Sequence, residues 1–234
     1  RTMGSIPFGG RYRLIDFPLS NMVNSGISEV GVITKSNYGS LLDHLGSGRE
    51  WDLTGKTGGL HLLPPFSHVG GGIYQGRLEA LNNVREFVEH SKSEYVVLSN
   101  CDVVTNIDFN AALQQHIDTE ADITIIYSKG FYSKEKNPST NVISVDENHT
   151  VKEVLITQFL KKIVQEAASK SQHSLVRDVL QGRKDEFVIK GYEHKGVFTK
   201  IDGLAAYYQA NLSLLQADTR AGLFQESAPI YTKV

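Results

Sequence analysis

Residues 30–34 read VGVIT, an uncharged run that contains four β-branched residues. Similar runs recur along the chain at 95–99 (YVVLS), 123–127 (ITIIY), 141–145 (NVISV) and 151–156 (VKEVLI). Short apolar runs of this kind are typical of strands that are buried on both faces, as in a parallel sheet. We therefore predict five strands at these places.

Helical patterns separate the apolar runs. Residues 16–26 (DFPLSNMVNSG) end on a glycine, which is a common helix stop. Apolar residues recur at helical spacing in 76–90, 109–117 and 159–168. Strands that alternate with helices predict an α/β sandwich with a mostly parallel sheet.

Composition narrows the classes of function. The chain has 234 residues, of which 40% are hydrophobic and 21% charged. This length and composition are typical of one large globular domain, or at most of one domain with a small appendage. Its net charge of −2 gives no general attraction to a phosphate backbone, so we expect no nucleic-acid partner. The single cysteine, Cys101, excludes an internal disulfide framework. No apolar run reaches the ~18 residues of a membrane span, and we expect no membrane partner.

Asp102 is the first candidate for chemistry. It follows the run 95–99 almost directly, and ligands of open α/β sheets bind at the carboxyl ends of strands. A carboxylate there can hold Mg²⁺ against phosphate oxygens. The alternative, slightly favoured by local sequence alone, is that Asp102 caps a turn or a helix. Cys101 beside it is expected to be a small buried hydrophobe and not a nucleophile.

Two further segments have both a functional and a structural interpretation. Gly9 and Gly10 precede Arg11 and Arg13, and this pattern can bind an anionic ligand. The alternative, which is the more common one, is a tight turn with two surface arginines. The glycine-rich stretch 55–72 predicts a loop or hairpin over a cleft, or a plain surface connection. Its apolar residues, with Trp51, either anchor a partner or form a lid on their own domain, which we favour.

A longer motif indicates a family. Residues 6–27, IPFGGRYRLIDFPLSNMVNSGI, closely resemble the signature of glucose-1-phosphate adenylyltransferases. The similarity continues through VGVIT, YQGRLEAL (74–81), VVLSNCDVV (96–104) and IDGLAAYYQANLSLL (201–215). The resemblance implies a Rossmann-like nucleotide-diphosphosugar transferase sandwich, followed by a left-handed β-helix. We thus expect a nucleotidyltransferase-like domain at 1–226, its Gly-rich phosphate loop missing before Arg1, and a linker at 227–234.

The resemblance also assigns site residues. Active members make ADP-glucose and pyrophosphate from ATP and glucose 1-phosphate, with Mg²⁺ held by two aspartates. Asp102 matches the first aspartate, whereas Lys200 occupies the place of the second and Asp202 lies two positions further on. A cation opposite a metal site repels Mg²⁺.

The remaining assignments concern nucleotides and anions. Gln75, Gly76 and Lys35 match nucleotide-binding positions, although Lys35 stands where the family has a glutamine. The anion or effector residues are Arg1, Arg11 and Arg13. A bulky pair, Arg77 and Leu78, replaces the family's small Thr-Ala pair. The sugar-phosphate lysine of the family has no counterpart near residue 156.

Because scaffold residues match and chemistry residues do not, the chain resembles the regulatory, GlgD-type branch of the family. That branch implies a cytoplasmic, weakly or non-catalytic subunit in bacterial glycogen synthesis. Its partners would be a catalytic paralogue in a heterotetramer, or further copies of itself. Its ligands would be ATP and glucose 1-phosphate, or a sugar-phosphate effector. Two alternatives stay open: an active adenylyltransferase that uses Mg²⁺, and a related enzyme for another sugar or nucleotide.

Overall fold

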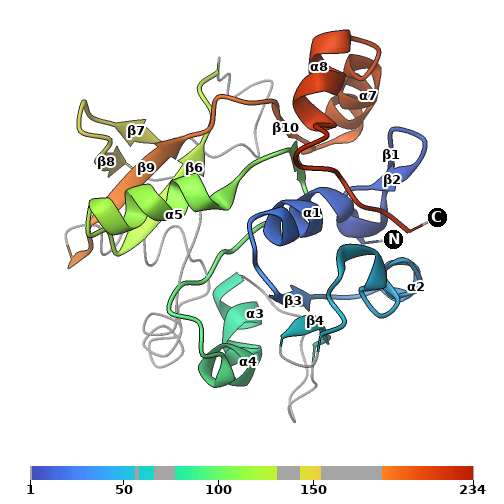
Figure 1. Cartoon of the computed structure of the whole chain (residues 1–234), viewed down its shortest axis with the longest axis horizontal. Coiled ribbons are helices and arrows are strands. Elements are labelled where there is room, and N and C mark those ends of the chain that lie inside the picture. Colours follow the sequence, from blue (N-terminus) through green and yellow to red (C-terminus); the bar gives the residue numbers. More distant parts are fainter. Residues whose placement is uncertain (1, 56–57, 66–76, 131–142, 154–185, 234) are drawn as a thin grey trace.

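The computed structural model describes residues 2–55, 58–65, 77–130, 143–153 and 186–233 (Figure 1). Its strands are β1 (Pro7–Phe8), β2 (Tyr12–Arg13), β3 (Glu29–Ile33), β4 (Gly59–Leu63), β5 (Val103–Thr105), β6 (Ile123–Tyr127), β7 (Ser144–Val145), β8 (Val151–Glu153), β9 (Ile189–Glu193) and β10 (Phe198–Lys200). Its helices are α1 (Asp16–Asn24), α2 (Gly39–Leu45), α3 (Arg77–Asn83), α4 (Arg85–His90), α5 (Phe109–Asp118), α7 (Leu204–Ser213) and α8 (Ala217–Leu223), with short 3₁₀ turns at Met3–Ser5 and Arg49–Trp51.

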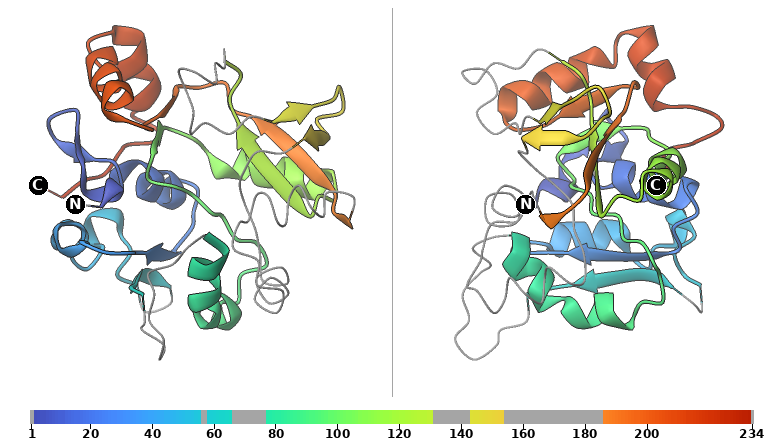
Figure 2. Two further views of the ribbon diagram at one scale, coloured as in Figure 1. Left: turned by 180° about the vertical axis from the view of Figure 1, so that it is seen from behind. Right: turned by 90° about the vertical axis from the view of Figure 1, so that its left-hand side faces the viewer.

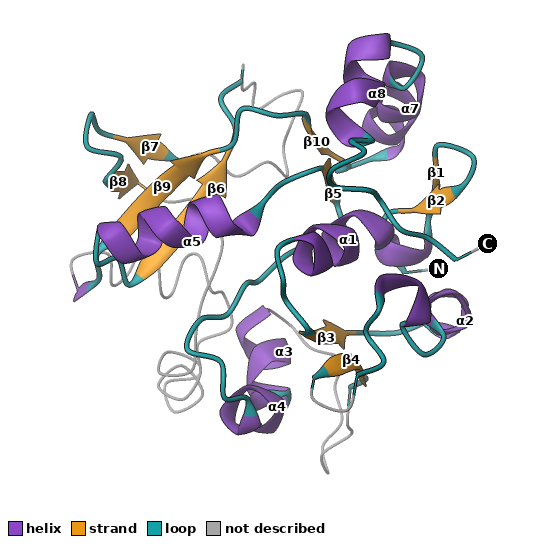
Figure 3. Ribbon diagram, in the orientation of Figure 1, coloured by secondary structure: helices purple, strands orange, loops and turns teal. Residues whose placement is uncertain are grey.

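The longest strand pairs are parallel. β3 pairs with β4 and β6 pairs with β9, each in parallel over five residues. The shorter pairs, β1–β2, β5–β10 and β7–β8, are antiparallel. Helix α5 crosses the face of the β6–β9 pair (Figure 3). The described residues therefore confirm the α/β class.

Helices cover both faces of the β3–β4 pair, as the turned view in Figure 2 shows. Val30 and Val32 are buried in one apolar cluster with Leu19 of α1. On the opposite face, the ring of Phe87 in α4 lies 5.1 Å from that of His61 in β4. Strands that bury both faces need apolar or small residues throughout, which explains the run VGVIT.

Some predicted elements are confirmed and others are wrong. β3, β6, α1 and α5 match the predictions within a few residues, and the described part of 76–90 is helical in two pieces, α3 and α4, that meet at Val84. The predicted strand at 95–99 is wrong, because those residues form no ladder in the described structure and β5 begins only at Val103.

Two other predictions need qualification. β7 and β8 occupy the end of the run 141–145 and the start of the run 151–156, and they pair with each other as a hairpin. The predicted helix at 159–168 lies outside the described residues.

The glycine-rich stretch is not simply a loop. β4 lies inside it and pairs with β3, which corrects the prediction of a loop or hairpin for 59–63. Gly58 makes the turn into β4 with φ of +88°, and a Cβ at this position would lie 2.6 Å from the backbone oxygen of Ser28. Trp51 is only 1% exposed and packs into its own domain, as the favoured alternative predicted.

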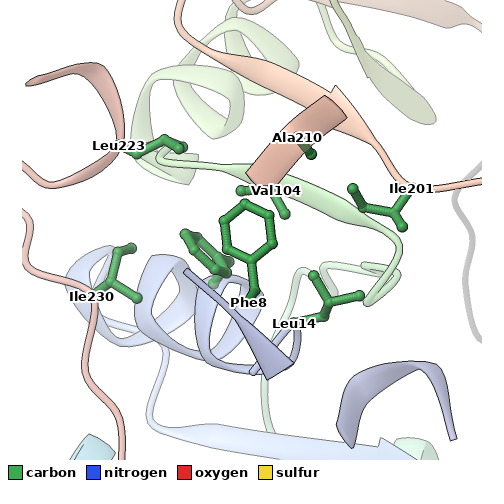
Figure 4. Close-up of a cluster of buried hydrophobic side chains, with 8 residues drawn as sticks. Phe8, Leu14, Val104, Ile201, Ala210, Leu223 and Ile230 are labelled. Atoms are coloured by element: carbon green, nitrogen blue, oxygen red, sulfur yellow. The ribbon is translucent and has the colours of Figure 1, made fainter. Parts of the chain in front are cut away.

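A second apolar cluster lies on the other side of α1 (Figure 4). It joins Phe8 near the N-terminus, Val104 in β5, Ile201 after β10 and Ile230 in the C-terminal segment. The backbone N–H of Tyr231 donates to Ser20 Oγ at 2.8 Å, so the C-terminal segment packs along α1. The expected linker role of 227–234 stays a prediction.

Candidate functional site

The β5–β10 pair holds the candidate site. In this antiparallel ladder Lys200 stands opposite Val103, the residue after Asp102. One step further on, the backbone N–H of Ile201 donates to the carbonyl oxygen of Asp102 at 2.6 Å. Asp102, Lys200 and Asp202 therefore lie at the same end of one two-stranded ladder, although 100 residues separate the two aspartates in sequence.

Packing fixes the register of that ladder. Val104 and Ile201 are 1% and 3% exposed and share the core cluster with Phe8. A slip of one residue would move both side chains to the other face, so burial specifies the pairing. Lys200 is consequently held opposite Val103, and Asp202 immediately precedes Gly203, the N-cap of α7.

The carboxylates of the site are partly buried and incompletely bonded. Asp102 Oδ1 and Asp202 Oδ2 are each buried without a hydrogen-bond partner among the described residues. A buried carboxylate oxygen without a partner is costly and favours a donor or a cation near it. This observation alone would suit a metal ligand.

The rest of the donor set does not fit the two-aspartate Mg²⁺ site that the family resemblance implies. No group of three or more His, Cys, Asp or Glu residues in the described ranges could hold a metal ion. Lys200 carries three N–H donors and no lone pair for coordination. Lys200 therefore cannot act as the second carboxylate ligand of such a site.

The environment of Cys101 disfavours its thiolate form. Burial raises the pKa of its thiol to about 12, with a smaller contribution from the charge of Asp102. The thiolate is the nucleophilic form, so a pKa this high leaves almost none of it near neutral pH. Cys101 is partly buried and packs against the apolar cluster that contains Leu19 and Val30, which agrees with an apolar role.

The nucleotide-binding candidates are dispersed. Lys35 is exposed just after β3, and within the described residues no hydrogen bond or ion pair joins it to Asp102. Its neighbour Thr34 is 3% exposed, and the hydroxyl of Thr34 has no partner in the same described ranges. Gln75 and Gly76 lie outside the described residues, so their role stays a prediction.

The arginine candidates for anion binding also differ in their surroundings. Arg11 is exposed in the turn between β1 and β2. Arg13 is half-buried, and its guanidinium donates to the carbonyl and hydroxyl oxygens of Ser40 at 2.7 and 2.9 Å. Arg13 therefore links β2 to the start of α2. Arg1 lies outside the described residues. An effector role for these arginines stays a prediction.

The sequence analysis missed one buried polar pair. His44 Nε2 and Asp16 Oδ1 lie 2.6 Å apart, and the two residues are 6% and 0% exposed. The other carboxylate oxygen of Asp16 accepts the backbone N–H of Arg13 at 2.8 Å. No periodic pattern joins residues 28 apart, so only the fold could reveal the pair. It ties α1 to α2 and has no evident catalytic role.

Among known protein families, the model described as nucleotidyl transferase matches residues 4–186 of the chain. The chain is 33% identical to the glycogen biosynthesis protein GlgD of Bacillus subtilis (strain 168), over 100% of the chain and 63% of that protein. It is 35% identical to GlgD of Geobacillus stearothermophilus, with the same coverage. It is 31% identical to a glucose-1-phosphate adenylyltransferase of Clostridium botulinum (strain Alaska E43 / Type E3), over 97% of the chain and 64% of that enzyme. The chain thus spans just under two thirds of these relatives.

A solved structure supports the architecture. The crystal structure of HddC from Yersinia pseudotuberculosis matches with a TM-score of 0.66 and 13% sequence identity, over 91% of this chain and 89% of that one. At this identity the match shows a common fold and confirms the Rossmann-like α/β class. None of the helices in the described ranges combines the length and the apolar character that crossing a bilayer requires.

Proposed function

The chain belongs to the nucleotidyl transferase family, and we propose that within it the protein is a regulatory, weakly or non-catalytic subunit of glucose-1-phosphate adenylyltransferase in bacterial glycogen synthesis. The observation that carries the proposal is the position of Lys200. It lies opposite Val103 in the β5–β10 ladder, where the family resemblance expects the second magnesium aspartate.

Electrostatics explains why this substitution bears on activity. Phosphoryl-type transfers depend on positioning and on neutralisation of the charge that develops on phosphate oxygens. An ammonium group cannot coordinate a metal, and it repels a divalent cation nearby. A subunit with Lys200 at this position therefore keeps the folded body and loses the main means of stabilising the transition state.

The sequence identities to known relatives support the regulatory proposal. The two GlgD proteins are 33% and 35% identical to the chain, and the Clostridium botulinum adenylyltransferase is 31% identical. The difference is small, so it supports the proposal without carrying it. The assignment to ADP-glucose formation and glycogen synthesis rests on the names of these relatives and on the sequence motifs.

A regulatory subunit needs a partner, and helix α7 offers a surface for one. Its inner face holds Tyr207, whose hydroxyl donates to the carbonyl oxygen of Pro7 at 2.6 Å. Its outer face presents an exposed apolar stripe that Leu215 continues just beyond the end of the helix. We call this stripe of Leu204, Tyr208, Leu212 and Leu215, with exposed fractions from 40% to 82%, the α7 outer face. Residues 203–217 contain no charged side chain. Contiguous exposed apolar surface marks protein interfaces, and we assign this one to a catalytic paralogue.

The test is an assay of ADP-glucose formation from ATP and glucose 1-phosphate with Mg²⁺. The chain alone should give no rate above the blank. Mixed with a catalytic relative such as the Geobacillus stearothermophilus adenylyltransferase, it should change the rate beyond the sum of the separate proteins. A rate for the chain alone that equals the catalytic relative would refute the proposal.

One observation favours an active adenylyltransferase as the second candidate. Asp202 follows the ladder by two residues, and its Oδ2 is buried without a partner in the described structure, as is Asp102 Oδ1. In this case the two carboxylates would both be needed for turnover. The variants Asp102→Asn and Asp202→Asn would each abolish a measurable rate, whereas under the regulatory proposal there is no rate to lose.

A further inference from the structure

A cavity of about 340 Å³ lies between the extended segment 94–97, helix α5 and strand β6. None of the residues that line it belongs to β5 or β10, so it is separate from the site at Asp102 and Lys200. Its volume falls at the lower end of the range of small-molecule pockets, which are mostly apolar and contain a few placed polar groups.

The interior of the cavity is built from regular elements. Phe109, Ala112, Leu113 and His116 follow one another at spacings of three, one and three residues, so they share one face of α5. Opposite them β6 contributes apolar side chains, including Ile123, which is 2% exposed. These elements give the cavity a rigid, apolar body.

One end of the cavity is polar and aromatic. The ring of Tyr95 meets that of His116 edge to face, with centroids 5.6 Å apart and an interplanar angle of 88°. His116 Nδ1 lies 2.9 Å from the hydroxyl of Thr124, which fixes the orientation of the imidazole. Two acidic residues, Glu94 and Asp122, also line the cavity.

The charge at the polar end is negative. Burial lowers the pKa of His116, although the nearby charge of Asp122 opposes the effect. His116 is therefore neutral at pH 7, and the two carboxylates are not offset by an imidazolium. Within the described residues, no lysine or arginine lines the cavity.

We propose that this cavity is a binding site for a small aromatic cation, whose ring lies between the α5 face and β6 and whose amidinium or ammonium head meets Glu94 and Asp122. A planar ring suits walls that carry Phe109 and the Tyr95–His116 pair. A cationic head suits two carboxylates, since charge-assisted hydrogen bonds to carboxylate are about twice as strong as neutral ones.

The experiment uses three probes of nearly equal shape on the full chain: benzamidine (cationic), benzamide (neutral) and benzoate (anionic). Binding is followed by the shift of the His116 imidazole signals in NMR spectra and by thermal stabilisation, since a ligand of the native state raises the Tm. Benzamidine should bind at least tenfold more tightly than benzamide, and benzoate should not bind. Equal binding of all three probes, or no binding of benzamidine, would overturn the proposal.

Substitutions of the two acidic residues test whether the preference for benzamidine arises at this cavity. Glu94→Gln combined with Asp122→Asn should remove the tenfold preference for benzamidine, and the asparagine oxygen can still accept the N–H of Val188 that Asp122 now accepts at 2.8 Å. Glu120→Gln serves as the matched control, because Glu120 is an exposed acid near α5 that does not line the cavity. A preference that survives the double substitution, or is lost in the control, would place the cation elsewhere and refute the site.

Discussion

The backbone N–H of Ile201 donates to the carbonyl oxygen of Asp102 at 2.6 Å, one step beyond the pair of Lys200 and Val103. This hydrogen bond connects two segments that carry the candidate site and that lie far apart in sequence. It also places a lysine in the ladder next to the one aspartate that the resemblance assigns to a metal.

Replacing Lys200 by aspartate should create affinity for Mg²⁺. The substitution removes the repelling ammonium and restores a carboxylate at the position where the family resemblance expects the second metal aspartate. We expect Mg²⁺ at millimolar concentration to raise the Tm of Lys200→Asp and to leave the Tm of the unmodified chain unchanged. Lys195→Asp, at an exposed position outside the ladder, controls for the change in net charge. Equal Mg²⁺ responses in all three proteins would contradict the role given to Lys200.

Cys101 should resist alkylation in the folded protein. Because burial raises the pKa of its thiol to about 12, only a minute fraction is thiolate at pH 8. Iodoacetamide should label the native chain at least a hundredfold more slowly than the chain unfolded in guanidinium chloride, as measured by mass spectrometry. Labelling at similar rates would show that the thiol is accessible and ionised.

Gly58→Ala should destabilise the fold by roughly 1–3 kcal/mol, the range for a residue forced into an unfavourable backbone conformation. Gly58 has φ of +88°, and the added Cβ would meet the backbone oxygen of Ser28 at 2.6 Å. Gly39→Ala is the matched control, because a Cβ at Gly39 has no atom within 4 Å. Denaturant unfolding measures both changes, and a control as destabilised as Gly58→Ala would argue against the strain at this turn.

Stability should decrease as the pH falls below about 6.5. Burial lowers the pKa of His194, against a smaller opposing effect of a hydrogen bond to the Val197 backbone. The unfolded chain therefore binds the proton first, and the stabilisation present above pH 6.5 is lost as the pH falls toward the lower, folded-state pKa. His194→Gln should flatten the dependence of the free energy of unfolding on pH between 7 and 5, and the exposed His90→Gln should not. An unchanged slope in His194→Gln would contradict this assignment.

The α7 outer face should matter for assembly and not for folding. Leu204 and Leu215 are 82% and 77% exposed, so replacing both by glutamate should change the Tm of the chain by little. The same substitutions should abolish co-elution with the catalytic relative in size-exclusion chromatography. A double variant that still co-elutes would place the partner on another surface.

The sequence predicted those elements whose pattern is local. β3 and β6 follow from uncharged β-branched runs, and the end of α1 follows from the glycine stop of residues 16–26. β4 was not predicted as a strand, because glycines surround it and its partner β3 lies about 30 residues earlier in the chain. The run 95–99 has the composition of a strand, yet the described structure assigns no strand to it.

The candidate site was predicted only in part. Asp102 and Lys200 could be singled out by resemblance, but their common ladder depends on the register that Val104 and Ile201 fix by burial. The buried contact of Asp16 with His44 and the cavity beside His116 had no signal in the sequence. Both depend on side chains from separate elements that only tertiary packing brings together.

The most direct measurement is the initial rate of ADP-glucose formation by the purified chain, with ATP, glucose 1-phosphate and Mg²⁺ at saturating concentrations. The account predicts no rate above the blank for the chain alone, and an altered rate when a catalytic relative is added. A chain that turns over by itself as fast as that relative, with Lys200 in place, would contradict the central claim.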